Sequence, residues 1–173
     1  MIPALPFSDP VRMHQVGAGL TRRLEPDAEA ARRIARALDL QALERFVADL
    51  DLRPVHEGWV LSGRVTAHVV QSCGLTLEPL PADIDRTFSI RIVESAPEPD
   101  AAEIDLSPDE EEVDLIEDGR IDLGQYAVEQ LSLALDPFPR KPGAEFVQPE
   151  EPAEISPFAA LKALRDKDGS GEG

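Results

Sequence analysis

The stretch FVADLDLRPVHEGWVLSGRVTAHVVQSC, residues 46–73, decides the fold, because it contains two β-strand patterns separated by a turn. From Phe46 to Arg53, one set of alternate residues is apolar and most of the others are charged, which is typical of a half-buried strand. HEG at residues 56–58 predicts the turn, and residues 59–73 predict a long second strand. We therefore expect an antiparallel hairpin with its tip at Glu57–Gly58.

The segments on both sides add a third strand and two helices. Residues 84–93 predict a strand, and residues 11–24 predict two short extended segments. Residues 26–39 predict a helix, and residues 122–135 predict a second one that starts with a capping box. The apolar face of the second helix should comprise Leu123, Ala127, Leu131, Ala134 and Leu135. The expected fold class is α+β: an antiparallel twisted sheet or half-barrel with two helices packed on one face.

The charge of the chain is unevenly distributed. Residues 1–93 contain 11 basic and 12 acidic side chains, a net charge of −1, whereas residues 94–173 contain 6 and 22, a net charge of −16. The run at 94–119 contains 12 acids and no base, so we expect most of it to be mobile, with VDLI at 113–116 pairing briefly as an edge strand. The second half should therefore repel a phosphate backbone and attract a basic protein.

These patterns predict one α+β domain at residues 1–145, with a flexible acidic insertion at 94–120. Residues 146–173 are expected to form a linker rich in proline and acids, followed by a short amphipathic helix with Phe158, Leu161 and Leu164 on one stripe. A single cysteine is compatible with a reducing compartment, and the sequence contains neither a signal-peptide pattern nor a long apolar span. We expect a soluble cytoplasmic protein.

Cys73 is the one residue that suggests covalent chemistry. A catalytic cysteine needs a nearby base, and His68, five residues away on the same strand, should point to the opposite face. A structural zinc site needs four ligands, usually in two close pairs, and this chain offers one cysteine and three scattered histidines. The acidic run also lacks the ligand alternation of a calcium loop. We expect a small buried residue, no metal, no cofactor and no enzymatic activity.

The best feature for nucleic-acid binding is a group of arginines around the first predicted helix. Arg32, Arg33 and Arg36 lie on adjoining parts of one helix surface and could bind phosphates. No aromatic residues are interleaved with the group for base stacking. This group comprises Arg22, Arg23, Arg32, Arg33 and Arg36.

Three segments together resemble the signature blocks of the YceD family, which is described as large ribosomal RNA subunit accumulation protein. They are VVQSCGLTLEPLPADIDRTFSI (69–90), IDLGQYAVEQLSLALDPFPRKPG (121–143) and SPFAALKALR (156–165). Family members commonly carry C-x-R-C in the first block and further cysteines after the prolines of the second. Here Val70 and Ser72 replace the first cysteine and the arginine, and no cysteine follows Pro142. The resemblance therefore implies a remnant of a metal site, with Cys73 kept for packing.

The resemblance implies a non-enzymatic role in accumulating large-subunit ribosomal RNA, and hence in assembling that subunit. Our first hypothesis is binding of a basic ribosomal protein or pre-ribosomal particle, with contacts from Glu110, Glu111, Glu112, Phe158, Leu161 and Leu164. The alternative is direct binding of ribosomal RNA precursor through the arginine group, with no membrane involved. A third, a cysteine-dependent enzyme, would rest on Cys73 alone.

Overall fold

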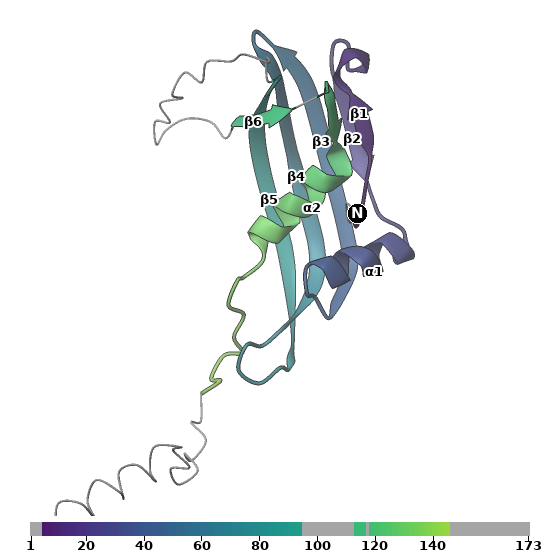
Figure 1. Ribbon diagram of the computed structural model, residues 1–173. Helices are drawn as coiled ribbons and strands as arrows, with labels where there is room; N and C mark the ends of the chain where they lie inside the picture. The colour runs from purple at the N-terminus through teal and green to yellow at the C-terminus, as the bar shows by residue number, and fades with distance from the viewer. Residues whose placement is uncertain (1–4, 95–112, 117, 146–173) are drawn as a thin grey trace, which may run out of the picture. The chain divides into compact units, whose positions relative to one another are not determined.

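A computed structural model describes residues 5–94, 113–116 and 118–145 of the chain. Its main element is an open five-stranded sheet in the order β2-β3-β4-β5-β6 (Figure 1). Neighbouring strands are antiparallel except β5 and β6, which are parallel. The strands are β2 (Leu20–Leu24), β3 (Ala42–Val55), β4 (Gly58–Ser72), β5 (Pro79–Glu94) and β6 (Val113–Ile116). The α+β prediction is confirmed, and the sheet does not close into a barrel.

The predicted hairpin is formed by β3 and β4. Val55 pairs with Gly58, so only His56 and Glu57 lie in the turn. Gly58 has a φ of 103°, and a Cβ atom there would lie 2.1 Å from the carbonyl oxygen of Ile92. Glycine is therefore required at this corner by both the backbone conformation and the close approach of β5.

The two faces of the sheet differ in chemistry because side chains alternate along each strand. The first face, here called the helix face, carries fully buried residues such as Leu50, Leu61 and Ile92. The opposite face, here called the open face, carries cross-strand charged pairs such as Arg64 and Asp85. Both helices lie against one face of the sheet (Figure 1). It is the face with the buried apolar residues, because Arg86 on that face donates to Gln130 of α2.

The two helices begin at acidic caps that the sequence places there. In α1 (Ala28–Ala37), the Asp27 carboxylate accepts hydrogen bonds from the N–H groups of Glu29 and Ala30. In α2 (Leu123–Ala134), the Asp122 carboxylate accepts one from the N–H of Gln125. The expected apolar face of α2 is buried at Leu123, Ala127 and Leu131 and half-buried at Ala134 and Leu135.

A small second sheet joins the start of the described chain to the segment immediately before α2. β1 (Pro10–Arg12) pairs antiparallel with β7 (Arg120–Asp122), and a 3-10 turn, Met13–Gln15, follows β1. Val11 and Ile121 are paired and buried, so this ribbon also contributes to the core. None of the helices in the described ranges is long and apolar enough to cross a membrane.

The VDLI stretch forms β6, an edge strand, as the sequence predicted. The remainder of the acidic run, residues 95–112 and 117, lies outside the described residues, as do residues 146–173. The predicted mobile insertion, the acids Glu110, Glu111 and Glu112, and the amphipathic tail therefore stay predictions.

Candidate interaction surfaces

The structure separates the two arginines that precede α1. Arg22 and Arg23 are neighbours on β2, so their side chains leave the sheet on opposite faces. The guanidinium of Arg23 donates to both carboxylate oxygens of Asp49, at 2.8 and 2.9 Å, across the open face. Nε of Arg22 lies 3.7 Å from Oδ2 of Asp9. These two side chains therefore belong to different surfaces, and each already has an acidic partner.

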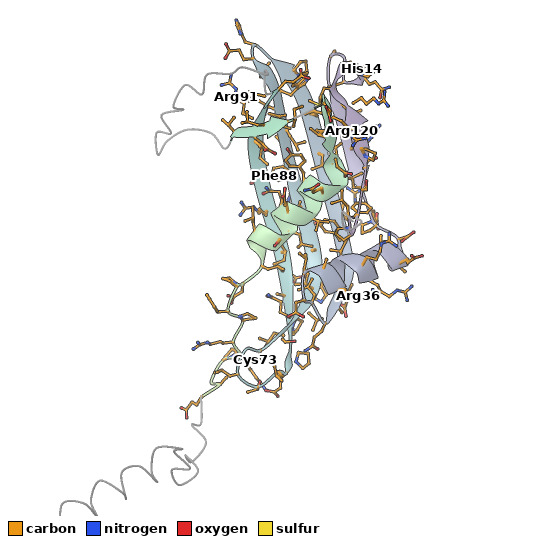
Figure 2. All side chains as sticks on the ribbon, in the orientation of Figure 1. His14, Arg36, Cys73, Phe88, Arg91 and Arg120 are labelled. Carbon is orange, nitrogen blue, oxygen red and sulfur yellow. The ribbon has the colours of Figure 1, made fainter. Side chains whose placement is uncertain are left out.

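The three arginines on α1 are also unequal. Nη1 of Arg33 lies 2.7 Å from Oε1 of Glu29, and its Nε donates to the carbonyl oxygen of Pro6 at 3.3 Å. Arg32 and Arg36 are exposed, and Arg36 is labelled in Figure 2. No carboxylate of the described residues forms an ion pair with either. Of the five arginines predicted as a group, two therefore keep an uncompensated charge.

Most charges of the open face are paired with one another. Arg64 and Asp85 form a two-pronged pair at 2.7 and 2.5 Å, which raises the pKa of Arg64 and lowers that of Asp85. Nδ1 of His68 lies 2.7 Å from Asp83, and the hydrogen bond to that carboxylate raises the pKa of His68. Apart from the exposed Arg45, which forms no ion pair with the described residues, the basic side chains of this face are therefore compensated by carboxylates.

Cys73 lies at the end of the sheet beside the chain that leaves α2 (Figure 2). Its side chain is 0 % exposed, and its sulfur accepts a hydrogen bond from the N–H of Lys141 at 3.4 Å. Hydrogen bonds from the Thr76 hydroxyl and from the N–H groups of Lys141, Leu75 and Thr76 lower the pKa of Cys73 to about 6. The cysteine is buried as expected, but in a cradle of donors rather than in an apolar environment.

The same corner is closed by an ion pair and by backbone contacts. The Gly74 N–H donates to the carbonyl oxygen of Pro139 at 2.8 Å, and Nζ of Lys141 lies 2.9 Å from Oε1 of Glu78. Among the residues that the structure describes, no three His, Cys, Asp or Glu side chains converge as a metal site requires. These contacts hold the segment after α2 against the β4–β5 connection.

A hollow of about 360 Å³ between α2, β5 and the start of β6 escaped the sequence analysis. Leu133, which is 59 % exposed, lies on its rim, and the hydroxyl of Tyr126 donates to the carboxylate of Asp114 within it. The available signal was that Leu133 is a large apolar residue outside the predicted apolar face of the helix. The main lining residues are Ile90, Asp114, Tyr126, Glu129, Gln130 and Leu133.

Comparison with known proteins gives one result. A family model described as "Large ribosomal RNA subunit accumulation protein YceD" matches residues 61–165, from β4 to beyond α2. No curated protein and no solved structure matches the chain.

Proposed function

Because this chain belongs to the YceD family of large ribosomal RNA subunit accumulation proteins, we propose that it is a non-enzymatic, cytoplasmic factor in biogenesis of the large ribosomal subunit. It supports accumulation of the large-subunit RNA by binding a basic ribosomal protein, free or in a pre-ribosomal particle. The description of the family names an accumulation factor and not a catalyst.

The observation that carries this proposal is the distribution of charge. Residues 94–173 have a net charge of −16, and most arginines of the sheet are compensated by carboxylates of the same chain, as in the pairs Arg23–Asp49 and Arg64–Asp85. Such a molecule attracts a cationic protein and repels a phosphate backbone. Basic ribosomal proteins need shielding before they meet RNA, and an acidic partner can supply it.

Two segments are proposed to make the contacts. The acids of the insertion would steer and hold the cationic partner, and an apolar stripe in the tail would add a hydrophobic anchor. The residues proposed for these roles are Glu110, Glu111, Glu112, Phe158, Leu161 and Leu164.

The test is capture of purified large-subunit ribosomal proteins by the immobilised full chain at low salt. Replacing Glu110, Glu111 and Glu112 by Gln should weaken capture of the basic partner by roughly tenfold, because each lost ion pair is worth ~0.2–1 kcal/mol. The matched control changes net charge equally in the first half of the chain, through Glu25→Gln, Asp39→Asn and Glu44→Gln. Equal loss in both triple variants would mean that the insertion has no specific role.

Direct binding of ribosomal RNA precursor has less support, because the structure leaves only Arg32 and Arg36 of the arginine group without an acidic partner among the described residues. Filter retention of RNA by the purified chain at low salt, lost on Arg32→Glu and Arg36→Glu, would favour this alternative over the proposal.

A further inference from the structure

The outer edge of β5 is unpaired over most of its length in the described part of the chain. β6 pairs only with Arg91–Glu94, whereas β5 extends back to Pro79. Figure 1 shows β6 alongside one end of β5 only. An edge strand presents a row of backbone N–H and C=O groups to which another extended chain can add.

The register shows which backbone groups point outward. The Cys73 N–H donates to the carbonyl oxygen of Glu78 at 2.9 Å, so Glu78 and the even-numbered residues that follow it along β5 are those that bond to β4. The N–H and C=O groups of odd-numbered residues therefore point away from β4. Pro79 and Pro81 occupy odd positions, as expected for residues that cannot donate to a ladder. Thr87 and Ser89 are the odd-numbered residues next to β6.

Part of this edge is protected against pairing, and part is not. Pro79, Pro81, Asp83 and Asp85 lie along its first half, and prolines and charges of this kind discourage the addition of a strand. The stretch from Thr87 to Ile90 carries neither proline nor charge. The unprotected stretch therefore lies beside the hollow formed by α2 and β6.

The hollow itself indicates the kind of side chain that an added strand would bring. Ile90 and the exposed Leu133 offer apolar surface. Asp114, which accepts the Tyr126 hydroxyl, and Glu129 give the lining a net negative charge. A lysine or arginine combines an aliphatic stem with a cationic end, and so satisfies both kinds of surface. A purely apolar side chain would satisfy only one of them, and an acidic side chain would be repelled by the carboxylates.

We propose that an extended, basic segment of the partner adds to the outer edge of β5 at Thr87 and Ser89 and places a lysine or arginine side chain in the hollow beside α2. This inference rests on the proposed function for the class of partner, and it names the surface that receives it. Backbone pairing supplies binding without sequence selectivity, and the acidic hollow selects for a basic residue.

The first test is residue-resolved amide hydrogen exchange of the full chain with the peptide acetyl-Lys-Val-Lys-Val-Lys-Val-Lys-amide. The amides of Thr87 and Ser89 should gain at least fivefold protection, whereas those of Phe88 and Ile90, which already bond to β4, should change little. The same peptide with every backbone amide N-methylated has the same charge but no backbone donors on either side of the strand, and should give no protection. Protection elsewhere, or equal effects of both peptides, would overturn the proposal.

The second test compares proline substitutions on the two edges of the sheet. Ser89→Pro removes an outward N–H without affecting the bonds to β4, and should weaken peptide binding at least tenfold. The same alternation places the Thr21 N–H on the outer edge of β2, so Thr21→Pro is the matched control and should bind within twofold of the wild type. Glu129→Gln, which needs no backbone change, should weaken binding several-fold. Wild-type binding by both Ser89→Pro and Glu129→Gln would refute the site.

Failure of this inference can be told apart from failure of the proposed function. Capture of a ribosomal protein equally by the wild type and Ser89→Pro would overturn the edge site and leave the function standing. Protection of Thr87 and Ser89 by the peptide, without capture of any ribosomal protein, would support the edge site and overturn the function. Protection of these amides by single-stranded RNA, and not by the peptide, would overturn the choice of partner.

Discussion

At the scale of the residue, the surroundings of Cys73 come from parts of the chain that are distant in sequence. Leu75 and Thr76 lie two and three positions after it, but the N–H of Lys141 reaches its sulfur from 68 positions away. Burial of Cys73 is predictable from the sequence, because a lone cysteine at the end of a strand commonly packs as a small apolar residue. The hydrogen-bond donors around its sulfur are not predictable in this way, because no residue near Cys73 determines the path of the chain after α2.

This environment makes a testable prediction about stability and pH. The folded-state pKa of Cys73 is about 6, below the ordinary value of 9.0. Because the folded protein binds the Cys73 proton less tightly than the unfolded chain does, the thiolate stabilises the folded state. This stabilisation is complete above the unfolded-state pKa and is lost as the pH falls through 6. The difference in urea midpoint between the wild type and Cys73→Ala should therefore increase from about pH 5.5 to about pH 8.5.

The control for this prediction is Val69→Ala, which removes atoms from another fully buried side chain that does not titrate. Its difference from the wild type should stay constant over the same pH range. A constant difference for Cys73→Ala as well would show that the sulfur stays a neutral thiol.

At the scale of the element, the middle of β4 depends on a glycine. A Cβ at Gly63 would lie 2.7 Å from Cδ2 of Leu50 and 2.8 Å from the carbonyl oxygen of Asp49. Gly63→Ala should therefore reduce the free energy of unfolding by about 1–3 kcal/mol, the usual cost of overpacking. Urea denaturation measures this, with Gly74→Ala as the control, since its nearest neighbour would be 3.6 Å away. Equal stability of the two variants would show that β3 can move aside.

The elements that the sequence predicted well are those with local determinants. The hairpin turn and both helix starts depend on residues within a few positions, such as Gly58, Asp27 and Asp122. The predicted start of β5, residue 84, was five residues too late, because β5 begins at Pro79. Pro79 and Pro81 suggested a loop, and the sequence does not show that they lie on an unpaired edge, where proline is tolerated. The arginine group was also divided by a contact that only the fold reveals, the pairing of Arg23 with Asp49.

At the scale of the whole molecule, the net charge of −17 should govern how fast a partner arrives. We expect the association rate constant with a basic ribosomal protein to fall by roughly tenfold or more between about 50 and 500 mM salt, because screening removes long-range attraction. The dissociation rate should change less. Stopped-flow mixing measures both rates, and the variant with Glu110, Glu111 and Glu112 replaced by Gln should show a shallower salt dependence. An association rate that is independent of salt would contradict electrostatic steering.

The pairing of β1 with β7 has a consequence for synthesis on the ribosome. Arg12 lies opposite Arg120, so the first strand to emerge has no partner until more than a hundred further residues have been translated. At ~5–20 residues per second, that delay is roughly 5–20 s. During this delay Val11 lacks its pairing partner, Ile121. A nascent chain that stalls before Arg120 therefore exposes this apolar residue to chaperones.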